Sequence, residues 1–439
     1  MFITALIAAL TLSAEPAPFE LKTTRLKNGL SVSRVKYGAK GLVSYYSVVR
    51  VGSRNEVEPG KTGFAHFFEH VMFKGTPKWP EGTRDAMLAG NGFNENAFTS
   101  DDVTVYHVSG PSSHLGKLVE VEADRFANLS FSESTFQTEA KAVLGEYHKN
   151  AANPGLKIEE TVLGAAFKTH PYRHTTLGFY DDIKAMPSQY EYAKQFFKRW
   201  YTPDNTMVFV VGDFDDTALM ADIEKHYGGW KGTVASVVIP PEPAQTSAKL
   251  ATVNWTTPTL PRLGMFWKVP AASLTGTDDA AATIAADYLA GETSPLFKAL
   301  VLDDQLAEQV RPDYSAHRDP TLFGIVATLK DEKHRAQVAT AVENAVKELA
   351  AGKVDRARVQ SILDHNRYGF IMGLETSDRL ALELAYAAGV RGVPDALLKA
   401  HQASLKVKAE DLVAFAKKRL VDTQKTSLVF TVDAPGATP

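Results

Sequence analysis

The sequence of 439 residues lacks cysteine, long internal hydrophobic runs and any large excess of one charge. Without cysteine the chain can form no disulfide, offers a metal no thiolate and carries no cysteine nucleophile. No apolar run past the N-terminus reaches roughly 18 residues, so we expect no stable membrane span. A formal net charge of −3, with no stripe of Lys and Arg, argues against nucleic acid as a partner.

A short apolar run does occur at the N-terminus, in residues 2–14. The run FITALIAALTLSA ends in small residues and precedes the polar, proline-containing EPAPFE. This pattern is typical of a secretory signal peptide, and it predicts a periplasmic or secreted protein. No Lys or Arg precedes the run and Leu12-Ser13-Ala14 is a poor cleavage site, so a buried N-terminal helix in a cytoplasmic protein is the alternative.

Apolar patterns predict strands and helices in both halves of the chain. In the first half, strands are expected at 30–35, 43–51 and 206–211, an alternating run at 97–108, and helices at 113–128 and 133–150. In the second half, strands are expected at 263–269, 322–329 and 427–432, and helices at 278–290, 333–350, 354–372 and 409–419. Gly, Pro and small polar residues cluster between the halves and predict a linker.

The second half repeats the outline of the first, and its last strand, Ser427–Val432, echoes Thr206–Val211. This repeat indicates an old duplication. We therefore predict an α+β fold of two homologous lobes, each a mostly antiparallel sheet with helices packed on one face. The expected divisions are a signal peptide at 1–14, a first lobe at 15–229, a linker at 230–248 and a second lobe at 249–439.

The segment His66-Phe67-Phe68-Glu69-His70 carries the clearest chemistry. On a helix the two histidines lie about one turn apart on one face, which suits two nitrogen ligands of a single Zn²⁺. Glu69 shares that face and can reach a metal-bound water. The order H-x-x-E-H is typical of the inverzincin metallopeptidases. An ordinary helix with two satisfied histidines and a solvated carboxylate is the alternative.

Zinc with two histidine ligands needs a further protein ligand, and the carboxylates of Glu139 and Glu146 are candidates. Their separation of seven residues is two helical turns, so both lie on one face, beside the apolar Ala142 and Val143. Burial of such a pair is costly unless it meets a cation or a metal. Two exposed helix carboxylates would show the same spacing.

Together these motifs resemble the pitrilysin/insulinase family of zinc peptidases. H-x-x-E-H is followed about 75 residues later by E-x6-E, and further segments agree: His66–Thr76, Asn96–Ser100 with Tyr106, and His170–Arg173 leading to Gly178. The chain length is similar to that of the small, two-lobed members that work in pairs, such as the zinc-bearing subunit of the mitochondrial processing peptidase. The resemblance implies that His66, His70 and Glu146 bind one Zn²⁺ and that Glu139 orients a ligand or tunes the site.

The resemblance also implies the reaction, which is zinc-dependent hydrolysis of peptides by an endopeptidase. Glu69 would take a proton from the zinc-bound water and return it to the leaving amine. The run Ala97–Tyr106 is a candidate edge strand to which an extended peptide could add. In the family this strand binds substrate, which makes Asn96, Ala97, Phe98 and Thr99 candidate substrate-binding residues, with Asn96 beside the scissile bond. An ordinary sheet strand is the alternative.

The sequence departs from the family in the second half, where members carry an Arg and a Tyr that grip the substrate. Here Val301 and Glu308 stand at those places, after the segment that begins at Ser294. Valine donates no hydrogen bond, and a carboxylate repels a developing oxyanion. Arg311 and Tyr314 lie nearby at a different spacing. We therefore expect a related second subunit to supply the Arg/Tyr pair in a heterodimer.

Two other interpretations remain open. Some family members are non-enzymatic core subunits of larger complexes, although the intact set of His66, Glu69, His70 and Glu146 argues against that role here. A presequence-processing peptidase is the second alternative, which the secretory-like N-terminus disfavours.

Overall fold

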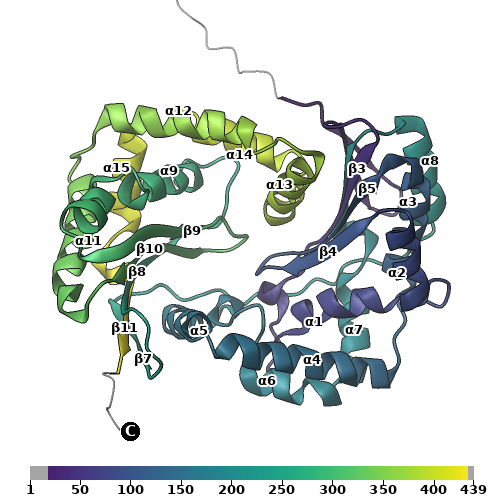
Figure 1. Ribbon diagram of the computed structural model, residues 1–439, viewed down its shortest axis with the longest axis horizontal. Helices are drawn as coiled ribbons and strands as arrows, with labels where there is room; N and C mark the ends of the chain where they lie inside the picture. Colours follow the sequence, from purple (N-terminus) through teal and green to yellow (C-terminus); the bar gives the residue numbers. More distant parts are fainter. Residues whose placement is uncertain (1–17, 434–439) are drawn as a thin grey trace, which may run out of the picture.

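The computed structural model describes residues 18–433, so the expected signal peptide at 1–14 lies outside the described residues. Two lobes face each other, each built on one sheet with helices outside it (Figure 1). No helix within residues 18–433 is long and apolar enough to cross a membrane.

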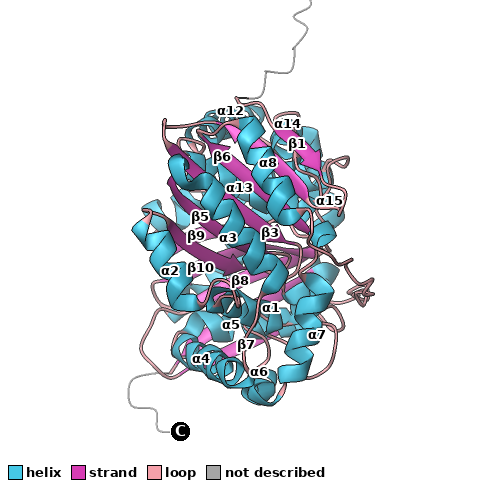
Figure 2. Cartoon of the chain, turned by 90° about the vertical axis from the view of Figure 1, so that its right-hand side faces the viewer, coloured by secondary structure: helices cyan, strands magenta, loops and turns pink. Residues whose placement is uncertain are grey.

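The first lobe contains a six-stranded sheet in the order β1-β2-β6-β3-β5-β4. Its strands are β1 (Lys22–Arg25), β2 (Ser31–Lys36), β3 (Leu42–Val49), β4 (Asn94–Thr99), β5 (Thr104–Pro111) and β6 (Thr206–Gly212). Its helices are α1 (Phe64–Val71), α2 (Glu81–Gly90), α3 (Leu115–Asn128), α4 (Glu133–Ala151), α5 (Pro154–Ala166), α6 (Tyr180–Ala185), α7 (Tyr190–Trp200) and α8 (Asp216–Tyr227). Helices α3 and α8 lie against the outer face of this sheet (Figure 2).

The second lobe contains a five-stranded sheet in the order β7-β11-β8-β10-β9. Its strands are β7 (Lys249–Trp255), β8 (Arg262–Val269), β9 (Ala307–Tyr314), β10 (Thr321–Leu329) and β11 (Lys425–Val432). Its helices are α9 (Asp278–Ala290), the short α10 (Pro295–Phe297), α11 (Arg335–Ala350), α12 (Arg356–Met372), α13 (Ser377–Arg391), α14 (Ala396–Ser404) and α15 (Ala409–Arg419).

Apart from the additional edge strand β1, which pairs antiparallel with β2, the two sheets share one topology, which supports the expected duplication. In each sheet the last strand of the half pairs parallel with one early strand: β6 with β2, and β11 with β7. The remaining neighbours are antiparallel in the same order, β6-β3-β5-β4 and β11-β8-β10-β9. The prediction of an α+β fold with two homologous, mostly antiparallel lobes is confirmed.

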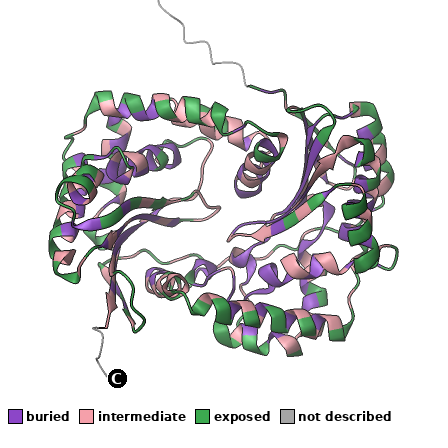
Figure 3. Ribbon diagram, viewed as in Figure 1, coloured by how far each residue is buried: buried purple, intermediate pink, exposed green. Residues whose placement is uncertain are grey.

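In each half of the chain, one helix packs on the inner face of the sheet of the other half. The sequence patterns did not indicate this exchange of helices. Helix α13 of the second half packs on β3 and β6, where Leu380, Leu384 and Ala388 join one apolar cluster with Val48 and Val211. Helix α5 of the first half packs on β7 and β11. Strands β3 and β6 are therefore buried on both faces, while the outer helices expose one side to solvent (Figure 3). The proposed lobe boundaries stay a prediction.

Residues 230–248, the expected linker, form neither helix nor strand. Hydrogen bonds through Glu242 nevertheless attach this segment to residues of both halves. The Glu242 carboxylate accepts hydrogen bonds from the backbone N–H groups of Lys168, Thr169 and His170 and from Lys268 Nζ. These donors favour the charged carboxylate and lower the pKa of Glu242 to about 2 against the opposing effect of burial.

The alternating run expected at 97–108 is a hairpin rather than one strand. Strand β4 ends at Thr99, and a turn closed by a hydrogen bond from Ser100 N to Val103 O leads into β5. The polar Asp101 and Asp102 interrupt the alternation at this turn. Only the β4 part of the run lies at the sheet edge, and in residues 18–433 it pairs with β5 alone.

Candidate metal centre

Helix α1 holds the H-x-x-E-H motif in a fixed orientation. Its apolar residues Phe64, Phe67, Phe68 and Val71 are fully buried in the core of the first lobe. At its start, the Glu56 carboxylate accepts the backbone N–H groups of Gly63 and Ala65 at 2.8 and 2.7 Å. A side-chain acceptor of this kind satisfies donors that a helix N-terminus leaves open.

Gly63 takes a positive φ of 89° where the chain enters α1, and a Cβ there would lie 2.6 Å from the carbonyl oxygen of Leu177. The tight packing therefore requires glycine at this position. Because α1 is held at its start and along its apolar face, the opposite face with the two histidines is fixed in place.

Helix α4 brings a carboxylate to the same place. It begins after Ser132, whose side chain accepts the N–H of Thr135, and buries Phe136, Ala140 and Val143 against the lobe. Glu146 is half-buried on the side that faces α1. The two helices thus meet with the polar residues of both motifs between them.

The structure brings His66, His70 and Glu146 together. The Glu146 carboxylate lies 3.5 Å from His66 Nε2 and 3.5 Å from His70 Nε2, and the candidate ligand atoms all lie within 4.8 Å of one another. Ligands of a tetrahedral zinc ion at about 2.05 Å are about 3.3 Å apart, so this separation fits one ion. It is the only such group of ligands in the described part of the chain.

The donor set also suits a metal electronically. His66 is almost fully buried, and this burial, together with nearby His70, lowers its pKa to about 4 against the effect of Glu146. Neutral imidazole has a lone pair available for a metal. His66 Nδ1 is buried and has no hydrogen-bond partner in the described residues. Two imidazole nitrogens and one carboxylate oxygen, with a fourth position open, are the ligands of catalytic rather than structural zinc sites.

Glu139 lies behind this group, where the resemblance implied an orienting role. Its carboxylate contacts Lys74 Nζ at 2.9 Å and lies 3.9 Å from His70 Nδ1. It therefore faces the ring nitrogen of His70 that points away from Glu146. At 3.9 Å the two groups form no hydrogen bond, so the orienting role of Glu139 stays a prediction.

Glu69 lies beside the three candidate ligands and accepts a hydrogen bond of 2.7 Å from Thr99 Oγ1. Burial raises the pKa of Glu69 above its ordinary value, although the Thr99 hydrogen bond opposes that shift. A carboxyl group that binds a proton more readily than usual is suited to accept and release one near neutral pH.

A cavity of about 550 Å³ opens at these residues. It is lined by His66, Glu69 and Glu146 and, from the edge strand β4, by Phe98 and Thr99. Asn96 is exposed at the start of the same strand, and Ala97 points into the core. The structure therefore places two of the four expected substrate-binding residues in the cavity itself.

The second lobe has no counterpart of this site within the described residues. Helices α9 and α12 occupy the places of α1 and α4 in the repeated topology, and α9 contains no histidine. Between them, Arg358 donates to the carbonyl oxygens of Asp287 and Tyr288.

The structure also shows the surroundings of Val301 and Glu308, which stand where family members carry the Arg/Tyr pair, and of nearby Arg311 and Tyr314. Val301 packs against the core of the second lobe, and Glu308 is exposed on β9. The Tyr314 hydroxyl donates to Asp279 at 2.9 Å, so it is already engaged. Arg311 is exposed, with Asp313 3.8 Å away.

The sequence did not predict a group of polar contacts between the two lobes, which we call the polar junction. The hairpin tip between β9 and β10 carries His317, which contacts Asp101 at 3.0 Å, directly after β4. Beside it, the Tyr172 hydroxyl donates to Asp102 at 2.6 Å, and His170 contacts Asp319 at 2.9 Å. The family-like segment from His170 was the available signal, but its partners lie far away in the sequence: Asp319 is 149 residues from His170, and Asp102 is 70 residues from Tyr172.

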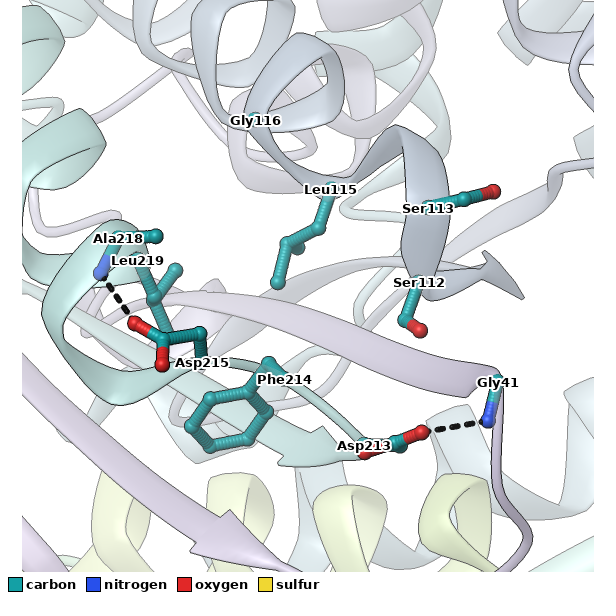
Figure 4. Close-up of a pocket in the computed structure, with 10 residues that line it drawn as sticks. All are labelled: Gly41, Ser112, Ser113, Leu115, Gly116, Asp213, Phe214, Asp215, Ala218 and Leu219. Carbon is teal, nitrogen blue, oxygen red and sulfur yellow. Dashed lines mark hydrogen bonds between the residues drawn. The ribbon is translucent and has the colours of Figure 1, made fainter.

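Within residues 18–433, no other hollow brings three candidate metal ligands together. Figure 4 shows another hollow on the first lobe, where the Asp213 carboxylate accepts the N–H of Gly41 and the Asp215 carboxylate accepts the N–H of Ala218. Both carboxylates therefore serve to hold the backbone, and no histidine lines this hollow.

Comparison with known proteins agrees with the geometry. The PqqE zinc protease of Helicobacter pylori is 29% identical over 421 residues, which cover 93% of this chain and 92% of that protein. A crystal structure of a protease from Helicobacter pylori matches with a TM-score of 0.86 at 28% identity, over 94% of this chain and 99% of that one. The periplasmic protease PqqL from Escherichia coli shares the fold, with a TM-score of 0.77 at 18% identity over 94% of this chain and 48% of that one.

Two sequence profiles of one family match successive parts of the chain. The profile described as insulinase (peptidase family M16) matches residues 42–178, which include all the candidate metal ligands. The profile described as the peptidase M16 inactive domain matches residues 189–365. The chain belongs to the insulinase (M16) family and is a metallopeptidase.

Proposed function

We propose that this chain is a zinc-dependent endopeptidase that cleaves extended peptides at the centre formed by α1 and α4. The observation that carries the proposal is the convergence of His66, His70 and Glu146, with the Glu69 carboxylate in the same cavity. These three residues would bind one Zn²⁺, and Glu139 would orient His70.

Bound zinc would supply a Lewis acid that polarises the scissile carbonyl and makes water a stronger nucleophile. Glu69 takes the proton released in the attack on the carbonyl carbon and passes it to the leaving amine. The Thr99 hydroxyl keeps one carboxylate oxygen of Glu69 oriented, and the buried surroundings favour the protonated form between the two transfers.

The free edge of β4 is suited to hold the substrate. A peptide that adds to an exposed strand gains main-chain hydrogen bonds with little sequence requirement. Strand β4 contains no proline and ends at Thr99, beside Glu69. The equivalent edge strand β9 is less suited, because Pro312 lacks an N–H and the exposed Glu308, Arg311 and Asp313 are charged.

We infer that a related second subunit completes the site. Val301 and Glu308 cannot stabilise an oxyanion, and the Tyr314 hydroxyl is engaged by Asp279. This chain covers 48% of the PqqL structure and 94% of the structure of its first half, so a unit of this size can be joined to further chain in one protein. Because losing one oxyanion donor costs about 10²–10³ in rate, the isolated chain should bind zinc and cleave slowly.

We place the protein in the periplasm or outside the cell. The apolar run at residues 2–14 supports export, and the relative PqqL is described as periplasmic. Fractionation of cells that express the full chain, with determination of the mature N-terminus, tests this location.

The experiment that tests the proposed reaction is the Glu69→Gln variant, assayed for peptide cleavage and zinc content. The amide keeps the shape of the side chain but cannot take a proton, so cleavage should fall about 10²–10⁴-fold while zinc stays bound. Glu133→Gln on the first turn of α4 is the matched control and should cleave like the wild type. Full activity of Glu69→Gln with zinc bound would refute the mechanism.

A further inference from the structure

The helix-facing side of strand β4 is held at every second residue. Thr99 donates to Glu69 on α1, and Ala97 lies in the apolar core of the first lobe. Glu95, the third residue of this series, accepts two hydrogen bonds from Arg84 on α2: Nη1 donates to Oε1 at 2.8 Å, and Nη2 donates to Oε2. Side chains two residues apart lie on the same face of a strand, so these contacts hold β4 against the helices and leave its edge free.

Arg84 belongs to a group of four charged residues, which we call the Arg84 cluster: Arg84, Glu95, Glu122 and Arg125. Nη2 of Arg84 also lies 3.3 Å from Glu122 Oε1, and Nη2 of Arg125 donates to the other oxygen of Glu122. The side chains of Arg84, Glu122 and Arg125 are 1% exposed, whereas that of Glu95 is 20% exposed. Burial alone would lower the pKa of Arg84, but the two carboxylates raise it above its ordinary value, so Arg84 keeps its charge.

The Arg84 cluster also contacts residues that support the metal helix. The ring of Phe73, shortly after α1, lies 5.7 Å from Cζ of Arg84 and 5.6 Å from Cζ of Arg125. Arg125 Cζ lies 5.1 Å from the ring of Tyr106, whose hydroxyl donates to the carbonyl oxygen of Phe68 on α1. The start of β4 and the helix that carries the proposed base are therefore attached to the same group of side chains.

Stability alone does not account for four charges at this place. Apolar residues of similar volume often replace a buried ion pair without loss of stability. Within residues 18–433, Nε of Arg84 and both Nε and Nη1 of Arg125 are buried and have no hydrogen-bond partner, which adds to the cost. The two parallel hydrogen bonds between Arg84 and Glu95, however, fix the direction of the contact as well as its distance. This geometry suits a residue that positions another.

We propose that Arg84 is a positioning residue of the peptidase: through Glu95 it holds the free edge of β4 in the extended form to which a peptide adds. The inference rests on the proposed peptidase function. A strand that is ordered before binding loses little conformational freedom when the peptide adds, which strengthens binding. Asn96, the expected neighbour of the scissile bond, follows Glu95 directly, so its position depends on this contact. Thr99 orients the proposed base and Arg84 orders the strand, so the two contacts should affect different kinetic constants.

The test is a double-mutant cycle on the full chain, with Arg84→Met, Glu95→Ala and the two combined. Methionine fills much of the space beside the Phe73 ring but cannot bind a carboxylate. Glu95→Ala changes a half-buried residue of an edge strand, and so guards against a folding defect in the buried Arg84→Met. Steady-state kinetics, zinc content and amide hydrogen exchange of residues 94–99 are measured on each variant.

Arg34→Met is the matched control. Arg34 is a largely buried arginine whose Nε lies 3.2 Å from Asp216, and its strand β2 is separated from β4 by three strands of the same sheet. Peptide dissociation constants are measured on the same variants combined with Glu69→Gln, which prevents turnover of the peptide.

We expect Arg84→Met to raise KM and the peptide dissociation constant about tenfold, roughly the cost of ordering one residue. The value of kcat should stay within about twofold, and zinc content should not change. Glu95→Ala should give the same result, and the double variant should be no worse than either, because the two residues act as one unit. Amide exchange at 94–99 should become faster in all three variants and stay unchanged in Arg34→Met.

A merely structural role would reduce the fraction of folded enzyme, which lowers the apparent kcat and leaves KM unchanged. That result in Arg84→Met, or additive effects of Arg84→Met and Glu95→Ala, would overturn the positioning role. Unchanged KM and unchanged exchange in an enzyme that cleaves peptides would also overturn it, while the peptidase proposal stands. If Arg84→Met weakens peptide binding as expected but the wild type cleaves no peptide, the positioning role stands and the proposed reaction is wrong.

Discussion

The Thr99 hydroxyl donates a hydrogen bond of 2.7 Å to the Glu69 carboxylate, and so joins the edge strand β4 to the metal helix α1. This contact fixes the position of the proposed base relative to the strand that would bind the peptide. Catalytic groups must be held within a fraction of an ångström, so removal of one orienting bond has a measurable cost.

Thr99→Val should therefore lower kcat about tenfold with little change in KM, because valine keeps the shape but cannot donate. Steady-state kinetics on a fixed peptide measures both constants. Thr99→Ser retains the hydroxyl and should lie close to wild type. A loss confined to KM in Thr99→Val would show that the residue contacts the peptide rather than orients Glu69.

Substitution of the proposed ligand Glu146 should lower the zinc content more than substitution of its neighbour Glu139. Glu146→Ala removes one of three ligands and should leave purified protein nearly free of zinc. Glu139→Gln removes only the carboxylate that faces His70 Nδ1, so zinc affinity should fall about 10–100-fold without loss of the site. Metal analysis against a competing chelator distinguishes the two. Full zinc occupancy in Glu146→Ala would remove this residue from the ligand set.

Glu242 should make the stability of the protein depend on pH at the acid end. Its pKa is about 2 in the folded chain and about 4.5 when free, so its contribution is present above about 4.5 and is lost as pH falls towards 2. Glu242→Gln should lower the free energy of unfolding at pH 7 by about 2 kcal/mol. The difference from wild type should shrink steadily below pH 4.5 in thermal melts. Glu348→Gln, an exposed carboxylate on α11, should show no such trend.

Because of His317, the stability of the protein should also depend on pH at the alkaline end, where it should fall as pH rises. The contact of His317 with Asp101 raises its pKa from 6.5 to about 9 despite burial, so it stabilises the junction fully below about pH 6.5 and loses that effect as pH rises through 9. His317→Gln should be less stable than wild type at pH 6 and nearly equal to it at pH 10. Thermal melts at both values measure this difference. If His114→Gln, an exposed control, shows the same trend, the effect does not come from the junction.

Local patterns in the sequence predicted the elements that carry their own periodicity. The helix expected at 278–290 is α9, and the strand expected at 206–211 is β6 with one more residue. The convergence of His66, His70 and Glu146 was expected on two grounds: the two histidines share one helical turn, and the resemblance to the family singled out Glu146 where spacing alone left Glu139 open. That these residues bind zinc stays a prediction.

What could not be predicted depends on distant partners. Nothing in the apolar pattern of α13 says that it packs on β3, more than 300 residues earlier in the chain, rather than on its own sheet. The contact between Asp101 and His317 is of the same kind, since two polar turn residues in separate halves look solvated until the lobes meet. The hairpin within 97–108 was not predicted, because both strands alternate with the same period. The turn of four residues between them was taken as part of one continuous strand.

Two helix glycines test the exchanged packing with opposite signs. Gly389 on α13 lies against the first sheet, where a Cβ would come within 2.6 Å of Val103 Cγ1 and 2.8 Å of Val48 Cγ1. Valine side chains are stiff, so Gly389→Ala should overpack the contact and destabilise the protein by about 1–3 kcal/mol. At Gly369 on α12 a Cβ meets nothing within 4 Å, so Gly369→Ala should stabilise by up to about 1 kcal/mol through helix propensity alone. Chemical denaturation of both variants measures the difference. If Gly389→Ala were as stable as Gly369→Ala, α13 would not pack closely on the first sheet, and the exchange of helices between the lobes would be wrong.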